Sequence, residues 1–182
     1  MRSIKLALVF ICLISTSAFC GVLIEPYVGY LSVKNSGTVE VFGMEADLEE
    51  TTAKGMGFGG RLGYGVGNIA LGLDYMTANL DDDGDDTKLT NIAGFATVNL
   101  ALLRLWAGYI FSSELEIDSD DLEGTIDGSG YKVGLGFSIL PKVSLNFEYL
   151  MLNYDKEDSD LLTAIDQDSK GFMVSLSFPF VF

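Results

Sequence analysis

The stretch that decides the fold is Gly55-Met56-Gly57-Phe58-Gly59-Gly60-Arg61-Leu62-Gly63-Tyr64. Large apolar side chains occupy one parity of this stretch, with Gly60 as the one exception, and the other parity holds glycines and one arginine. Successive side chains point to opposite faces in a β-strand, whereas a helix would mix these two sets around its axis. Residues 55–64 are therefore predicted to form a strand with one large apolar face and one small face.

The same period of two extends outward from this stretch in both directions. The alternative for residues 91–111 is a single apolar membrane helix, but it would place Asn99 and Arg104 near the middle of a bilayer, where a charge is costly. Two strands joined by a turn at Ala101-Leu102 avoid that cost. The pattern predicts eight strands in all, at about 22–32, 55–64, 68–78, 90–100, 103–111, 130–139, 143–152 and 171–182.

The size of the side chains decides which face of these strands is outside. A soluble sandwich or a lipocalin would pack its large apolar face inward and show polar groups to water. Here the second face is too small and too rich in glycine for an ordinary wet surface. It suits the narrow interior of an eight-stranded barrel, with the large apolar face toward lipid.

The connections between the predicted strands alternate between short and long. The short ones are Gly65-Val66-Gly67, Ala101-Leu102 and Leu140-Pro141-Lys142. The long ones, at about 33–53, 79–88, 112–129 and 153–170, carry 5, 5, 7 and 6 acidic residues, which is 23 of the 26 in the chain. The sequence thus predicts an all-β fold: an eight-stranded antiparallel up-and-down transmembrane β-barrel with four long acidic external loops.

Composition narrows the chemistry of this chain. It has 182 residues, a formal net charge of −15, a mean hydropathy of +0.32 and no histidine. The negative charge argues against binding nucleic acid, whose phosphates attract basic surfaces. The lack of histidine excludes histidine-based catalysis and histidine-ligated metal sites.

The first twenty residues are predicted to be a secretory signal peptide, followed by one barrel domain at 21–182. A short basic start, an apolar core at 6–14 and a run of mostly small residues support this interpretation, with cleavage after Ala18 or Cys20. The alternatives are an N-terminal core helix and a lipid anchor on Cys20, although Phe19 stands where a lipoprotein has a small residue. Both cysteines lie in this segment, so no internal disulfide is expected in the mature chain.

Six charged residues fall on the inward parity of the predicted strands. Three acids and three bases can neutralise one another in a narrow lumen as packed ion pairs, or they can line a conduit. Trp106 is also expected to point inward and fill the lumen. The predicted lumen ion pairs involve Glu25, Asp74 and Glu148 with Arg61, Arg104 and Lys132.

The end of the chain carries the most specific resemblance to a known family. Val174, Leu176, Phe178, Phe180 and Phe182 alternate up to the last residue. This pattern resembles the small outer-membrane barrels of Gram-negative bacteria, of the OmpA and OmpX type, over the whole mature chain. The resemblance implies that the barrel-assembly machinery reads this signal. It also implies a multi-pass outer-membrane protein with extracellular loops and periplasmic termini, in contact with lipid and lipopolysaccharide.

Two functional hypotheses from different classes follow. The first is a non-enzymatic barrel that presents acidic loops, with an envelope or adhesion role and a lumen plugged by ion pairs. The alternative is a small pore or transporter gated by the lumen charges. No cofactor is expected, but Asp81, Asp83 and Asp85 resemble the start of a calcium loop, and a weak calcium site is the alternative there to a solvated hairpin tip.

Overall fold

A computed structural model describes residues 19–41, 44–47, 50–82, 85–119, 122–140, 142–158 and 163–182. This part of the chain is built from strands, and none of its segments is a helix long and apolar enough to cross a membrane. Residues 1–18 of the predicted signal peptide lie outside it. The strands are β1 (Phe19–Val41), β2 (Met44–Asp47), β3 (Thr51–Gly67), β4 (Ile69–Asp82), β5 (Asp85–Leu100), β6 (Leu103–Ser119), β7 (Leu122–Leu140), β8 (Val143–Asp158), β9 (Thr163–Ser177) and β10 (Phe180–Val181).

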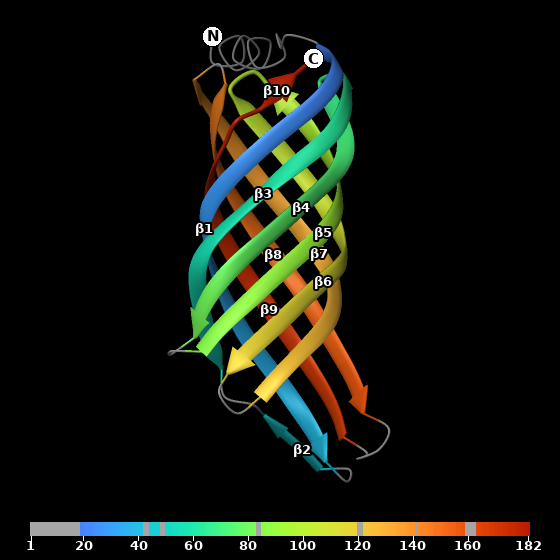
Figure 1. The fold of residues 1–182 in the computed structure, drawn as a ribbon. Coiled ribbons are helices and arrows are strands. Elements are labelled where there is room, and N and C mark those ends of the chain that lie inside the picture. Colours follow the sequence, from blue (N-terminus) through green and yellow to red (C-terminus); the bar gives the residue numbers. More distant parts are fainter. Residues whose placement is uncertain are drawn as a thin grey trace, which may run out of the picture.

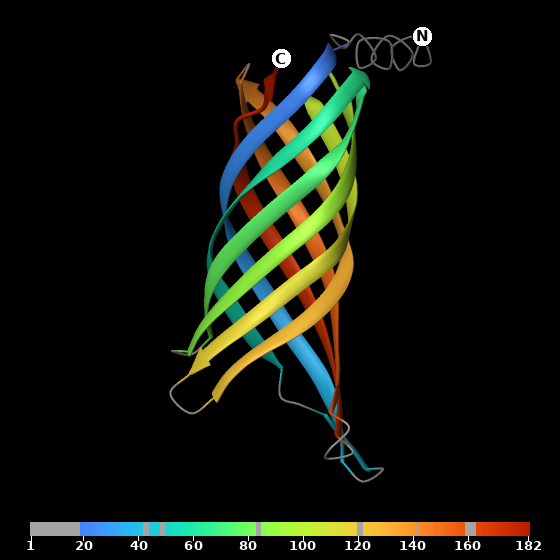
Figure 2. The same ribbon diagram turned by 45° about the vertical axis from the view of Figure 1, so that its right-hand side comes forward.

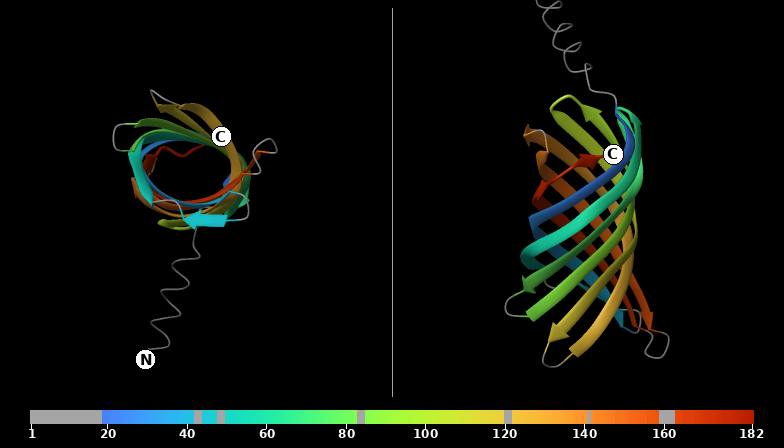
Figure 3. Two further views of the ribbon diagram at one scale, coloured as in Figure 1. Left: turned by 90° about the horizontal axis from the view of Figure 1, so that it is seen from below. Right: turned by 45° about the horizontal axis from the view of Figure 1, so that its top comes forward.

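The strands close into an eight-stranded antiparallel barrel, as predicted. Neighbours along the chain pair in the order β1-β3-β4-β5-β6-β7-β8-β9, and β9 pairs back with β1 (Figures 1 and 3). The short strand β2 adds only to β1. Strand β10 continues β9 in the same register on β1 after Pro179, which has no N–H to give to a ladder.

The stagger of the strands makes the barrel narrow. A row of directly opposite residues that leaves β1 at Glu25 returns to β1 at Asn35, ten residues further along. Eight strands with this stagger are strongly tilted, and they enclose an interior only wide enough for side chains. The row passes through Arg61, Asp74, Ala93, Ile110, Gly130, Leu152 and Ser169.

The prediction of four long loops is wrong for most of their length. The strands run on in paired hairpins to 41, 82, 119 and 158, and these hairpins reach different heights (Figures 1 and 2). The ladder continues because the alternation persists into these segments: Leu80, Leu89 and Leu115 remain buried. We call this the hairpin end of the barrel, and the end that holds the C-terminus the turn end.

The turn end has tight connections, as expected, with two shifts. Leu140 was predicted to lie in a turn, but it pairs with Val143 as the last residue of β7. Gly65 and Val66 were predicted to lie in a turn, but they pair with Ala70 and Ile69 as strand residues. The chain reverses instead at Gly67, which adopts a positive φ of 65°, and Asn68. Glycine accepts that backbone conformation without steric cost, so it sets the position of the turn.

Exposure confirms which face is outside. On β3 the outward Phe58 and Leu62 are each 57% exposed, whereas Arg61 between them is 3% exposed. Outward side chains of the other strands repeat this pattern. They include Ile24, Val28, Leu71, Leu73, Leu105, Val133, Phe172 and Leu176.

Candidate functional site: the charged layer of the lumen

The structure brings all six predicted lumen charges together in one buried layer. Each comes from the inward parity of its strand, and none is more than 8% exposed. Three acids and three bases give the layer a formal charge of zero. The six are Glu25 on β1, Arg61 on β3, Asp74 on β4, Arg104 on β6, Lys132 on β7 and Glu148 on β8.

Arg61 is the centre of this layer. Its Nε donates to Asp74 Oδ2 at 2.9 Å, and its Nη2 donates to Glu148 Oε1 at 2.6 Å. Its Nη1 donates to Glu25 Oε1 at 3.3 Å. Glu25 and Asp74 are direct cross-strand neighbours of Arg61, so part of this cluster follows from register alone.

The other two bases complete the pairing. Arg104 forms a two-pronged contact with Glu25, in which Nη1 donates to Oε2 at 2.7 Å and Nη2 donates to Oε1. Lys132 donates to Asp74 and lies 3.8 Å from Glu148 Oε2. Every carboxylate therefore faces two bases, which is the condition under which buried charges are tolerated.

Polar and aromatic groups enclose the layer. Tyr27 OH donates to Asp74 Oδ1 at 2.7 Å, and Asn146 Oδ1 accepts from Arg104 at 3.3 Å. The Trp106 ring lies under both guanidinium groups, 4.5 Å from Arg61 Cζ and 5.1 Å from Arg104 Cζ. Contacts of this kind stabilise a desolvated cation. Trp106 therefore points inward, as expected.

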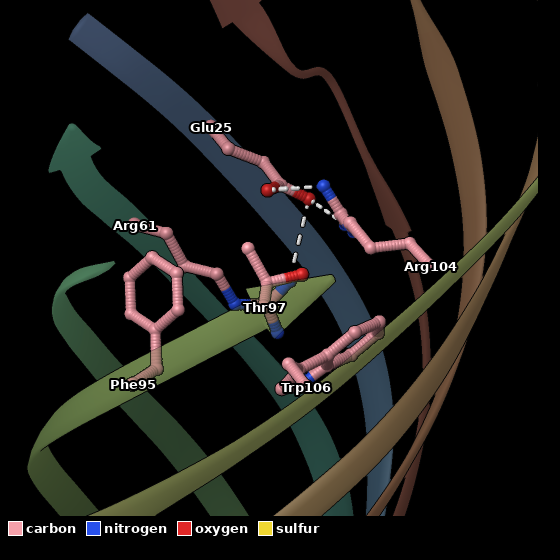
Figure 4. Close-up of a pocket in the computed structure, with 6 residues that line it drawn as sticks. All are labelled: Glu25, Arg61, Phe95, Thr97, Arg104 and Trp106. Carbon is pink, nitrogen blue, oxygen red and sulfur yellow. Dashed lines mark hydrogen bonds and ion pairs between the residues drawn. The ribbon is translucent and has the colours of Figure 1, made fainter. Parts of the chain in front are cut away.

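A pocket lies on the turn-end side of this layer. Figure 4 shows Glu25 reaching across it to Arg104, with Trp106 and Phe95 on its far side. Arg61 and Thr97 complete its lining. Three of the six lumen charges therefore border this pocket.

The inward glycines have a specific role that the sequence pattern did not reveal. Every buried aromatic ring in the described lumen lies directly opposite a glycine on a neighbouring strand. A Cβ built on Gly134 would lie 2.2 Å from the Trp106 ring, and one on Gly59 would lie 2.6 Å from Tyr27. The glycines thus leave room for rings to lie flat in a narrow interior. The opposite pairs are Tyr27–Gly59, Phe95–Gly72, Phe95–Gly108, Trp106–Gly134 and Tyr154–Gly128.

The expectation that the whole inward face is small or polar is wrong for the hairpin half of the lumen. That half is filled by a cluster of fully buried apolar side chains. Several of them fall in segments predicted to be loops, where strand alternation was not followed far enough. The sequence signal was present, since Met76, Ala78 and Leu80 continue the inward parity of Asp74. The main members are Leu31, Val33, Met76, Leu80, Leu89, Ile110, Leu115, Leu150, Leu152, Tyr154 and Met173.

The calcium candidates lie at the tip of the β4–β5 hairpin. Asp81 is exposed and opposite Asp86, and the backbone register sets Asp85 opposite Asp82. Asp83 lies outside the described residues. Within the described side chains, no group of three metal-binding residues comes together.

The assembly-signal residues run along the seam where the barrel closes. Val174, Leu176 and Phe178 face outward on or just after β9. The peptide N–H of Phe182 donates to the carbonyl of Val22 at 3.0 Å, and the N–H of Val22 donates back to Phe182 at 2.9 Å. Phe182 is the most exposed of them, at 77%.

Comparisons with solved structures agree with this architecture. The chain is 16% identical to Neisserial surface protein A, at a TM-score of 0.50, with 85% of this chain and 97% of that one covered. It is 12% identical to Ail, the attachment invasion locus protein of Yersinia pestis, at a TM-score of 0.53, with 89% and 100% covered. The outer membrane protein OprG of Pseudomonas aeruginosa gives 12% identity and 0.52, with 91% and 99% covered.

These likenesses show the fold, and a family match goes further. No curated protein sequence matches the chain significantly. The family model named "Outer membrane protein beta-barrel domain" matches residues 6–178, which is nearly the whole chain. With the closed barrel and its apolar outer face, this match places the protein in the outer membrane, which it crosses by its strands. The chain belongs to the outer membrane protein beta-barrel domain family.

Proposed function

We propose that this protein is a closed, non-enzymatic outer-membrane barrel that presents acidic hairpins outside the cell, in an envelope or adhesion role. In this proposal residues 1–20 are removed on export, and the termini lie in the periplasm. The observation that carries this proposal is that two different sets of buried side chains block the lumen, one after the other along its length. A charged layer fills the turn half, and an apolar cluster fills the hairpin half.

The charged layer and the apolar cluster each oppose the passage of an ion, through a different free-energy cost. To open the charged layer, Arg61 must leave carboxylates that it holds at 2.6 to 3.3 Å inside a buried site. Separating a buried ion pair costs several kcal/mol. An ion that passed this layer would still meet an interior of leucine, methionine and tyrosine, where a charge is poorly solvated.

A non-enzymatic role agrees with the residues available. The chain has no histidine. The three lumen carboxylates are each held by two bases, which leaves none of them as a free general base. Small acidic side chains at the hairpin end suit contacts with a partner or with cations, not chemistry.

A gated pore remains the second candidate, and one observation favours it. Arg104 lines the pocket and pairs with a single carboxylate, that of Glu25, whereas Arg61 pairs with three. A swing of Arg104 toward the pocket would therefore break fewer contacts than any movement of Arg61. Such a movement would loosen the charged layer at its turn-end side.

Single-channel recording separates the two candidates. We expect the protein, purified from outer membranes and inserted in a planar bilayer, to show no steps of current in salt solution. An Arg104→Met variant should stay equally silent, because the apolar cluster is intact. Reproducible steps that change in size or lifetime with Arg104→Met would overturn the closed barrel and make transport the function.

The same proposal assigns two further roles. Val174, Leu176, Phe178, Phe180 and Phe182 are recognised by the barrel-assembly machinery, and their place at the closing seam supports this. A weak calcium site at Asp81, Asp83 and Asp85 is the alternative to a solvated tip. Millimolar calcium should then raise the thermal midpoint of the protein, and an unchanged midpoint at several millimolar would remove the site.

A further inference from the structure

Three lysines gather on adjacent strands at the hairpin end of the barrel. Lys34 on β1, Lys54 on β3 and Lys170 on β9 are all exposed, while their inward neighbours Val33 and Ala53 are buried. Strands β9, β1 and β3 are consecutive around the barrel, so the three ammonium groups share one outer face. We call these three residues the lysine patch.

The lysine patch lies just beyond the lipid-facing apolar surface. Lys54 is the next outward position after Met56, which is 57% exposed, and Lys170 is the next after Phe172. Each such step is about 7 Å along a strand. The lysines therefore reach the depth at which the headgroups of the surrounding lipid lie, and not the depth of its hydrocarbon.

The register concentrates positive charge within the patch. Lys34 and Lys170 are directly opposite each other on β1 and β9, so their β-carbons are about 5 Å apart. Like charges in this arrangement repel and destabilise the strand pair. Lys34 is paired with Glu50 at 2.6 Å, but within the described side chains neither Lys54 nor Lys170 forms an ion pair.

Two acids besides Glu50 lie near the patch. Asp81 is opposite Lys54, and Asp168 lies two positions from Lys170 with its carboxylate accepting from Asn153 at 2.8 Å. Within the described side chains, neither carboxylate is within ion-pair distance of a patch lysine. On the other side of the barrel the outer face at this height is acidic instead. There Glu114 and Asp127 are exposed and directly opposite each other on β6 and β7.

We infer that the lysine patch binds the phosphate groups of a phosphorylated lipid in the outer leaflet, with lipid A as its occupant. Phosphate offsets the repulsion between Lys34 and Lys170, and the neighbouring Phe172 and Met56 contact the acyl chains of the same lipid. Basic side chains at headgroup depth attract anionic lipids in this way. The inference rests on the proposed orientation, with the hairpin end outward.

Binding is tested with the full mature protein in vesicles of phosphatidylcholine, with and without diphosphoryl lipid A. The variant is Lys34→Gln/Lys170→Gln, and the matched control is Lys88→Gln/Lys142→Gln. The control removes the same charge from Lys88, which pairs with Glu116 at 3.0 Å, and from Lys142 at the turn end. The thermal midpoint and the amount of lipid A retained on purification are the readouts.

Lipid A should raise the midpoint of the wild type and of the control. At low salt the patch variant should bind it about 25-fold more weakly, since each lysine contributes about fivefold. In phosphatidylcholine alone the variant should be no less stable than the wild type, because a repulsive pair is lost. Equal losses in control and variant, or no effect of lipid A, would overturn the inference.

Inorganic phosphate distinguishes the lipid from a free ion. Added to phosphatidylcholine vesicles, it should leave the midpoint unchanged, because the acyl contacts are missing. A shift equal to that from lipid A would show a site for free phosphate and overturn the assignment to a lipid. Current recordings are separate, so failure of the closed barrel and failure of lipid binding are told apart.

Discussion

The turn half and the hairpin half of the lumen belong to one barrel but are filled by different kinds of side chain. In the turn half, six charges and their polar neighbours occupy the interior. In the hairpin half, apolar side chains such as Leu31, Ile110 and Met173 are fully buried in one cluster. The first half depends on every ion-pair partner being present, because a buried charge without a partner is costly. The second depends mainly on how well its side chains fill the interior.

The difference shows how one barrel closes its bore without a domain inside it. Along the row that leaves β1 at Glu25, charges alternate in sign through Arg61 to Asp74, so each strand neutralises the next. In the hairpin half no such alternation is needed, and the chain uses size. Aromatic rings with facing glycines connect the two halves, since Tyr27 bonds to Asp74 and also packs in the apolar cluster.

Removing the central cation should break the turn half most severely. Arg61→Met leaves three buried carboxylates short of a base, so we expect a loss of about 3–5 kcal/mol in the free energy of unfolding. Urea titration of the refolded barrel, followed by the mobility of the unboiled protein on a gel, measures it. Lys142→Met, at the exposed turn end, is the control and should change little. Equal free energies of unfolding for the two variants would show that the charged layer does not stabilise the fold.

The pairing of rings with glycines predicts a smaller effect that links the two halves. Gly134→Ala places a Cβ against the Trp106 ring, which stacks beneath the guanidinium groups of Arg61 and Arg104. Overpacking of this kind costs about 1–3 kcal/mol. Because Trp106 is the single tryptophan, its emission spectrum should also shift. Gly94→Ala is the matched control, since a Cβ there meets nothing within 4 Å, and an equal loss in both would remove this role for the glycines.

The sequence predicts the barrel well because alternation acts on every strand, yet it predicts the lumen only in part. Glu25, Arg61 and Asp74 were identified as inward charges from parity alone, and their pairing follows once β1, β3 and β4 are in register. The contact of Arg61 with Glu148 joins residues 87 positions apart, across the bore, and depends on stagger and rotamer. The apolar half was not predicted because the predicted strands end where runs of acidic residues begin. Such runs are typical of loops, but strands that extend beyond a membrane can also have charged side chains on their water-facing side.

One amide in each half provides a matched pair for the comparison. Asn91 is 3% exposed in the apolar half, and its side-chain nitrogen and oxygen have no partner among the described residues. We expect Asn91→Leu to raise the free energy of unfolding by about 1–2 kcal/mol, because an unsatisfied buried amide is replaced by a side chain of similar size. Asn146→Leu should lower it, because Asn146 bonds to Ser177 at 2.9 Å and to Arg104. The same urea titration measures both, and a loss at Asn91 would reveal a bound water or ligand that the amide serves.

The smallest expected effect tests the charge rule outside the lumen. Beyond the apolar half, the register places the exposed Glu114 on β6 directly opposite the exposed Asp127 on β7. These two residues carry the same sign where the lumen row alternates, and directly opposed like charges are destabilising. Glu114→Gln should therefore raise the free energy of unfolding by about 0.2–1 kcal/mol at low salt. The gain should shrink at high salt, because screening weakens repulsion between exposed charges. A gain that is independent of salt would mean that repulsion between the two carboxylates is not its cause, and that the rule of alternating sign holds for buried charges alone.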